Sequence, residues 1–406
     1  DYDKHGDLDL FVGGRVVSGG YPSNPKNFIL QNTAGKFTDV TSQVCPKLED
    51  MGMVTDALWS DFDGDGKIDL VLAGEWMPVT FLRNNGSHFL PHQSGIGQQT
   101  GWWNSLVSGD FDNDGDIDYI AGNLGINSNY VASEKEPMTV LAKDLDNNGS
   151  LDAMLFCYMK AEDGTMQPFP MHAKDDLVSQ VVSIRKKYPT YTSYGLATMN
   201  ELWKEEDKKT ALVKTANYLQ SSFIENKGNG QFILKPLPLE AQVAPIFGMS
   251  AEDIDHDGNL DLVMVGNDFS MEPYSGRHDA FNGLCLQGDG TGNFSPMPIP
   301  RSGFFVKGDA KGLAKIHTAG KEDLYIVSQN QDSVLAFASG KNPSKWIKLK
   351  ADDHYADITY KDGRKRRVEF YYGSTYLSQS SRYFAVADYI ASVTITNFKG
   401  VKRKLL

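Results

Sequence analysis

Aspartates spaced for metal binding are the residues with the clearest chemistry in this chain. The segment DFDGDGKID, residues 61–69, carries carboxylates at positions 1, 3, 5 and 9 of a loop and a glycine at position 6 that permits a tight turn. Such a loop wraps side-chain oxygens around one point, and the backbone carbonyl of position 7 adds another. Hard oxygen donors in a flexible cage suit Ca²⁺ better than Mg²⁺ or Zn²⁺. The spacing therefore predicts a calcium site.

The same nine-residue loop occurs five times, beginning at Asp1, Asp61, Asp110, Asp144 and Asp253. The Asp144 copy has Asn148 at position 5, and the Asp1 copy has His5 there, which is a poor calcium donor. One copy alone could be a run of turns with solvated carboxylates, but five copies in one context argue against that reading. We expect up to five structural calcium ions, held by Asp1, Asp3, Asp9, Asp61, Asp63, Asp65, Asp69, Asp110, Asp112, Asp114, Asp118, Asp144, Asp146, Asn148, Asp152, Asp253, Asp255, Asp257 and Asp261.

The charge balance agrees with a cation as the natural partner. The 406 residues include 40 Lys and Arg against 52 Asp and Glu, a net charge of −12, which argues against binding to nucleic acid or to anionic membranes. No apolar run is long enough to span a membrane. Cys45, Cys157 and Cys285 are odd in number and far apart, so we expect buried free thiols. No signal peptide is visible, and because Asp1 already lies inside a motif we expect natural sequence upstream of it.

The elements around the loops repeat as well. Each loop leads into an apolar strand, as in DLVLAG (69–74), and four loops are followed by a segment with the pattern of a β-hairpin, at 28–40, 80–92, 221–237 and 284–297. Four strands repeated every 40 to 60 residues or so are typical of a β-propeller. A sixth, degenerate unit at 308–339 lacks the acidic spacing. The pattern predicts an all-β fold, a propeller of six to seven four-stranded blades with calcium loops.

A helical insertion is expected at about 171–216, interrupting the fourth unit. Apolar residues recur at a helical period over 171–189, and the segment 197–216 has a similar pattern. The insertion carries His172 beside Asp175 and Asp176, so a general base is conceivable there. A polar helix face with mixed charge is more often simply solvated, and Lys174 and Arg185 fit that reading.

Two resemblances cover nearly the whole chain. The loops followed by DLVLAG or DLVMVG, with IFGMSAEDIDHDG at 246–258, resemble FG-GAP/VCBS repeats of the kind found in integrin α-chain propellers and bacterial surface proteins. Near the C-terminus a Tyr-Gly-Ser-x-Tyr-Leu-Ser-Gln-Ser stretch resembles an ASPIC/UnbV domain, although AVADY replaces the usual GLG-like segment after it. The matching residues are Tyr372, Gly373, Ser374, Tyr376, Leu377, Ser378, Gln379 and Ser380.

These resemblances imply a domain plan and a location. They imply an FG-GAP/VCBS-like propeller over 1–340 and a small ASPIC/UnbV-like β domain over 341–406. Such proteins are typically secreted or displayed by bacteria, so an extracellular, cell-surface or periplasmic location is expected. The propeller would serve adhesion or glycan handling, and the resemblance implies no defined activity.

Aromatic residues in the loops are the candidates for ligand contact. Trp76, Trp102, Trp103 and Tyr130 could form a stacking platform for sugar rings, because propeller faces are built from loops. Packing between blades is the stronger alternative, because aromatic residues next to propeller strands more often pack there.

Two hypotheses for the function remain open. No nucleophile elbow, Walker loop, dinucleotide fingerprint or HExxH motif is present, so no catalytic residue is predicted. The first hypothesis is a calcium-stabilised extracellular module for binding or adhesion that recognises a glycan or a partner protein. The alternative is a calcium-dependent polysaccharide lyase of the rhamnogalacturonan-lyase type, which needs an exposed Ca²⁺ and a nearby base. Loops saturated by protein ligands favour the first, and the sequence leaves the oligomeric state open.

Overall fold

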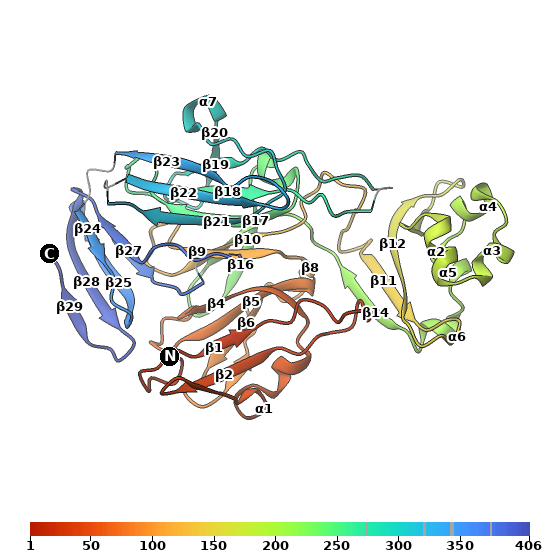
Figure 1. The fold of residues 1–406 in the computed structure, drawn as a ribbon, viewed down its shortest axis with the longest axis horizontal. Helices are drawn as coiled ribbons and strands as arrows, with labels where there is room; N and C mark the ends of the chain where they lie inside the picture. The colour runs from red at the N-terminus through yellow and green to blue at the C-terminus, as the bar shows by residue number, and fades with distance from the viewer. Residues whose placement is uncertain (273–274, 320–321, 342–344, 374–375) are drawn as a thin grey trace.

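Short antiparallel strands are the main secondary structure of the computed structural model, which describes residues 1–272, 275–319, 322–341, 345–373 and 376–406 (Figure 1). The predicted all-β class is confirmed. Five sheets make up the main body, a sheet with helices projects at one end, and two small sheets formed by the C-terminal residues lie at the other (Figure 1). Ser374, a residue of the predicted C-terminal motif, lies outside the described residues.

Three sheets of the body have the predicted order of strand, acidic loop, strand and hairpin. In each of them the acidic loop joins the first two strands, and the strands pair in sequence order. The second sheet also receives β8 (Gly101–Trp102) beside its second strand. The strands are β4 (Met53–Ser60), β5 (Asp69–Met77), β6 (Thr80–Asn84) and β7 (Phe89–Pro91); β9 (Ser105–Gly109), β10 (Asp118–Gly122), β15 (Ser222–Asn226) and β16 (Phe232–Pro236); and β17 (Ile246–Glu252), β18 (Asp261–Gly266), β19 (Leu284–Gly288) and β20 (Phe294–Met297).

The first and last sheets of the body have three described strands each. The Asp1 loop precedes the first sheet directly, and the last sheet lacks an acidic loop, as the sequence predicts. Their strands are β1 (Leu10–Val12), β2 (Phe28–Thr33) and β3 (Lys36–Asp39), then β21 (Ala310–His317), β22 (Glu322–Gln329) and β23 (Leu335–Lys341). Short helices connect the sheets, namely α1 (Thr41–Val44), η1 (Pro46–Asp50), η2 (Leu239–Gln242) and α7 (Ile299–Ser302).

The Asp144 loop belongs to an inserted sheet rather than to a unit of the body, which corrects the predicted blade plan. Strands β11 (Met138–Lys143), β12 (Asp152–Lys160), β13 (Met166–Pro170) and β14 (Leu212–Ala216) pair in the order β13-β12-β11-β14. This sheet lies in sequence between β10 and β15, and β15 pairs with β10. The hairpin at 221–237 therefore completes the third unit, not the fourth. The described residues show no closed ring, and the count of six to seven blades stays a prediction.

The inserted helices are shorter than predicted. The segment 171–189 forms α2 (Lys174–Gln180) and α3 (Ser183–Lys187), and later residues form α4 (Tyr191–Gly195), α5 (Met199–Leu202) and α6 (Glu205–Lys208). The end of the predicted second helix is strand β14, because the β-branched Val213 and Thr215 pair with the edge of β11. Trp203 is buried against Met154 of the inserted sheet and holds the helices to it.

Aromatic rings fill the space between neighbouring sheets of the body. Phe81 of β6 stacks on Phe232 of β16 with ring centroids 4.1 Å apart. Phe294 of β20 packs edge-to-face against Phe111 of the Asp110 loop and Phe223 of β15. The three cysteines are buried and free, as predicted. Among the described helices none has the length and apolar character of a membrane span.

Residues 345–373 and 376–406, here called the C-terminal module, form two small sheets. A described segment of the predicted C-terminal motif ties this module to the last sheet of the body, because the backbone N–H of Ser381 donates to Lys315 O (2.7 Å) and that of Lys315 donates to Ser380 Oγ (3.0 Å). Tyr376 packs on Phe247 of β17. The strands are β24 (Lys345–Lys348) with β27 (Tyr383–Val386), and β26 (Lys365–Glu369), β25 (Asp353–Tyr360), β28 (Ile390–Asn397) and β29 (Lys402–Lys404).

Gly122, the last residue of β10, lies close to the next sheet of the body, and its replacement is the first test of this packing. A Cβ at Gly122 would lie 2.6 Å from the carbonyl oxygen of Ile246 in the next sheet and 2.5 Å from Ser105 Oγ. We expect Gly122→Ala to lower the free energy of unfolding by about 1–3 kcal/mol, measured by urea denaturation. The control Gly97→Ala meets open space and should leave it nearly unchanged. Equal stability of the two variants would contradict the close approach.

Candidate metal centres

Each of the five acidic loops gathers three carboxylates at one point. The aspartates at loop positions 1, 3 and 9 bring one oxygen each to within 4.8 Å of the others, in all five copies. Position 9 opens the following strand, and its carboxylate accepts the backbone N–H of the third strand, 2.7 Å from Asn84 N at Asp69 and 2.8 Å from Asn226 N at Asp118. The sheet itself therefore fixes one carboxylate of each of these clusters.

The residues at position 5 lie outside these groups of three, and their predicted role as ligands stays a prediction. Asp65, Asp114 and Asp257 are not members of the clusters, and each of them accepts the backbone N–H of position 7 of its own loop through Oδ1. Asn148 does the same in the Asp144 loop. In the Asp1 loop His5 is exposed and its Nδ1 lies 3.1 Å from Asp3 Oδ2.

Neighbouring loops in the body are linked to one another through asparagine amides. Asn84 Nδ2 donates to Ile68 O of its own loop and to Tyr2 O of the Asp1 loop. Asn226 Nδ2 likewise donates to Ile117 O of its own loop and to Phe62 O of the Asp61 loop. These bonds place the loops of consecutive sheets side by side on one face of the body.

Buried carboxylate oxygens without a hydrogen bond show that the clusters suit a cation. Asp61 Oδ1, Asp69 Oδ2 and Asp253 Oδ1 are buried and unpartnered, and both oxygens of Asp110 lack a hydrogen bond of normal geometry. An unpaired buried carboxylate oxygen is costly, so a ligand that supplies positive charge would be strongly favoured. At the Asp61 loop, Arg83 forms an ion pair with Asp63 of the cluster, with Nε and Oδ2 2.5 Å apart. The clusters could therefore hold metal ions.

The carboxyl groups of the clusters have raised pKa values, mainly because they are buried. Burial raises the pKa of Asp61 to about 7, with the neighbouring Glu369 charge adding to it, and raises that of Asp69 to about 8. Burial likewise raises the pKa of Asp110 to about 7 and that of Asp118 to about 9. Without a metal the folded loops therefore take up protons near neutral pH.

Sequence reasoning missed the C-terminal residues that meet the loops. Glu369 is buried and accepts hydrogen bonds from Asp61 N (2.9 Å) and Ser60 Oγ (2.7 Å), although 308 residues separate it from Asp61. Tyr389 donates its hydroxyl to Asp253 Oδ2, and Arg366 donates to Gly258 O of the same loop. No local pattern marks these residues, because their roles arise only when the module is folded against the body.

The predicted aromatic platform does not lie on the surface. Trp103 is fully buried between the second and third sheets, and Trp76 and Tyr130 are each 5% exposed. Trp102 is half-buried and packs between Trp76 and Tyr130, with ring centroids 5.3 Å from each. The structure brings three of the four residues together, but as packing next to the inserted sheet.

The polar residues of the insertion are occupied by structural contacts. His172 Nε2 accepts the backbone N–H of Leu155, and its Nδ1 lies 3.3 Å from Glu272 Oε1. Lys174 Nζ donates to Pro189 O, and Asp175 accepts from Tyr191. The imidazole thus bridges the insertion and the body, and its ring nitrogens are already engaged.

Comparisons with known proteins identify one repeat of the chain. Residues 61–121 match the model of the FG-GAP-like repeat, a segment that holds two of the acidic loops and part of the second and third sheets. No curated protein matches the chain.

Two solved structures align with it at low scores. The V. cholerae biofilm matrix protein Bap1 has 11% identity over 97% of this chain and 71% of its own, with a TM-score of 0.23. BBS1N, solved in complex with ARL6DN, has 7% identity over 86% of this chain and 91% of its own, with a TM-score of 0.21. Both scores are too low to support an argument about this chain.

The raised pKa values predict an unusual pH dependence for the metal-free protein. A carboxyl group whose folded pKa lies above its unfolded value of about 3.9 favours the folded state while protonated, and this stabilisation is lost as pH rises through the folded pKa. For Asp61, Asp69 and Asp118 the loss begins above the unfolded pKa of about 3.9 and is complete only above their folded pKa values of about 7, 8 and 9. The melting temperature of chelator-stripped protein should therefore fall between pH 6 and 9, and millimolar calcium should remove the fall. A flat profile for the stripped protein would contradict this account.

Proposed function

We propose that this chain is a calcium-stabilised extracellular module for binding or adhesion, which recognises a glycan or a partner protein. The observation that carries the proposal is the set of buried, unpartnered carboxylate oxygens in three loops of the repeat. The FG-GAP-like match at residues 61–121 supports it, because two of these loops begin within the matched segment.

Calcium is the proposed ion because the donors are all hard oxygens. Three carboxylates from positions 1, 3 and 9 would hold the ion in each loop, with backbone oxygens completing the shell, and the described clusters contain no histidine or cysteine that would favour zinc. When bound, the ion supplies the positive charge that the clustered carboxylates lack. Five divalent ions would add +10 to the chain's −12, leaving about −2.

The binding role is favoured over the lyase alternative. A lyase of that type needs a base with a free nitrogen beside an exposed ion. His172, the predicted candidate, is held between Leu155 and Glu272. An extracellular or cell-surface location follows from the adhesion proposal and is part of it.

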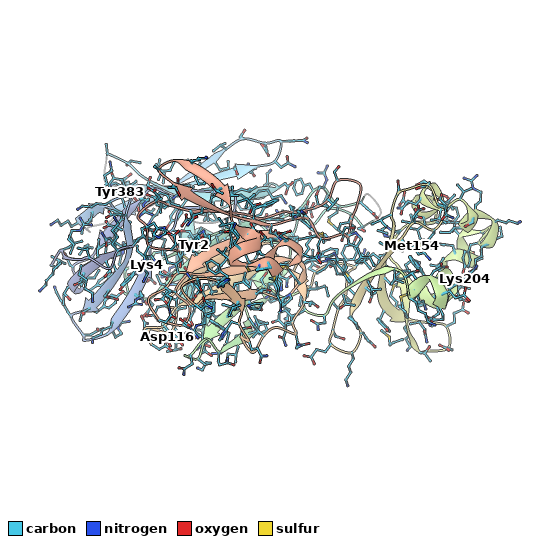
Figure 2. All side chains as sticks on the ribbon, turned by 90° about the horizontal axis from the view of Figure 1, so that it is seen from below. Tyr2, Lys4, Asp116, Met154, Lys204 and Tyr383 are labelled. Carbon is cyan, nitrogen blue, oxygen red and sulfur yellow. The ribbon has the colours of Figure 1, made fainter. Side chains whose placement is uncertain are left out.

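Metal content tests the calcium half of the proposal. We expect equilibrium dialysis followed by elemental analysis to find up to five calcium ions per chain, and Asp63→Ala to lose one of them, because each cluster belongs to its own loop. Asp116→Ala is the matched control, since Asp116 (labelled in Figure 2) is a loop aspartate outside every cluster. A chelator should lower the melting temperature of the wild-type protein substantially. An unchanged melt would contradict structural calcium.

A polysaccharide panel tests the binding half. The protein in calcium is mixed with acidic and neutral polysaccharides, and both retention on the glycan and the ultraviolet absorbance of unsaturated uronate products are followed. The proposal expects calcium-dependent retention on a glycan, or on an extracellular protein tested the same way, without growth of absorbance. Growth of absorbance would overturn the binding assignment and make the protein a lyase.

A further inference from the structure

Among the described residues the C-terminal module forms hydrogen bonds with three of the five acidic loops, while Lys399 of the module only lies beside Gly6 of the Asp1 loop. The module reaches the Asp61 loop through Glu369, the Asp110 loop through Arg366, and the Asp253 loop through Arg366 and Tyr389. The Asp144 loop lies in the insertion, which Figure 2 places at the end of the molecule away from Tyr383 of the module, as the labels Met154 and Lys204 show.

The loops that form hydrogen bonds with the module are the ones with unpartnered buried oxygens. These oxygens belong to the Asp61, Asp110 and Asp253 loops, and within the described residues none is found in the Asp1 or Asp144 loop. The module thus lies against these loops without itself supplying partners for all their buried oxygens. A bound cation is the remaining means of compensating them.

The first aspartate of two covered loops divides its two oxygens between different partners. Asp253 Oδ2 accepts from Tyr389 of the module and from Gly258 N of its own loop, while Oδ1 has no partner. Asp61 Oδ2 accepts from Gly66 N and lies 3.7 Å from Arg367 Nη1 of the module, while Oδ1 again has no partner. Each carboxylate therefore offers one oxygen to the module and the other to an ion.

The module forms hydrogen bonds with backbone and side-chain amide groups of the loops, and the positions of these groups depend on the loop conformation. Arg366 donates to Asn113 Oδ1 and Gly258 O, and Arg364 donates to Asn259 Oδ1. Glu369 accepts from Asp61 N. A loop fixed by an ion would present these groups in place, whereas a metal-free loop with repelling carboxylates would not hold them there.

We propose that calcium binding at the Asp61, Asp110 and Asp253 loops and docking of the C-terminal module are coupled, so that each strengthens the other. The inference rests on the proposed calcium function and extends it by assigning the module as the partner of this loop face. Tyr389 acts as a positioning residue for the Asp253 carboxylate, and Glu369 acts as one for the backbone of Asp61. The reciprocity follows from linkage, because an ion that stabilises docking must bind more tightly when the module is docked.

Hydrogen exchange of the full chain tests the coupling. In excess calcium the amides of β25 and β28 should exchange about tenfold more slowly than in chelator, a coupling of ordinary size. If calcium binds but this exchange does not change, the coupling is wrong and the calcium function stands. If no calcium binds, both proposals are overturned.

Paired loop variants give the sharper comparison. Asp253→Asn and Asp144→Asn should each lose one calcium ion, but only Asp253→Asn should speed exchange in β25 and β28, because of these two loops the Asp253 loop is the one whose described residues contact the module. Equal effects of the two variants on the module would overturn the proposal.

A hydroxyl deletion tests the reverse direction of the linkage. Tyr389→Phe should weaken one calcium site by about tenfold, measured by competition with a chromophoric chelator, since the hydroxyl orients Asp253. Tyr372→Phe is the matched control, because its hydroxyl donates to Ala351 O inside the module. Unchanged calcium affinity in Tyr389→Phe would contradict coupling at this loop, and circular dichroism establishes that both variants fold.

Discussion

Repulsion between carboxylates held within 4.8 Å of one another is the constraint on which the rest of the structure depends. Position 9 cannot move away, because its carboxylate is tied to the neighbouring strand, as Asp69 is to Asn84. Burial then raises the energy of the charged form, which the raised pKa values of Asp69 and Asp118 record. The clustered carboxylates in the loop between the first two strands of each repeat therefore favour the binding of a cation.

Contacts between neighbouring sheets connect each of these loops to the next. Asn84 and Asn226 each bridge two loops, and aromatic stacks such as Phe81 on Phe232 hold the sheets behind them. The C-terminal module then covers the Asp61, Asp110 and Asp253 loops with Glu369 and its neighbours. On this account the loop face is a negatively charged surface. Ions bound at the clusters neutralise its charge, and the module covers it.

The loops and the units around them were predictable because their signals are local. Alternating carboxylates and the apolar run after Asp69 need only neighbouring residues, and the described sheets follow that order. The pairing of β15 with β10 was not predictable, since an inserted sheet separates them in sequence. Strand β14 was mistaken for helix because Val213 and Thr215 owe their conformation to pairing with β11. Burial of Trp103 and the contact of Glu369 with Asp61 likewise depend on distant partners.

Anomalous diffraction from crystals grown in calcium would test the central claim most directly. The account predicts anomalous peaks between the carboxylates of positions 1, 3 and 9, present at the Asp61, Asp110 and Asp253 loops beneath the module. It also predicts that Arg83 moves off Asp63 when the ion is bound. Clusters that hold only water, or Arg83 in place of an ion, would contradict it.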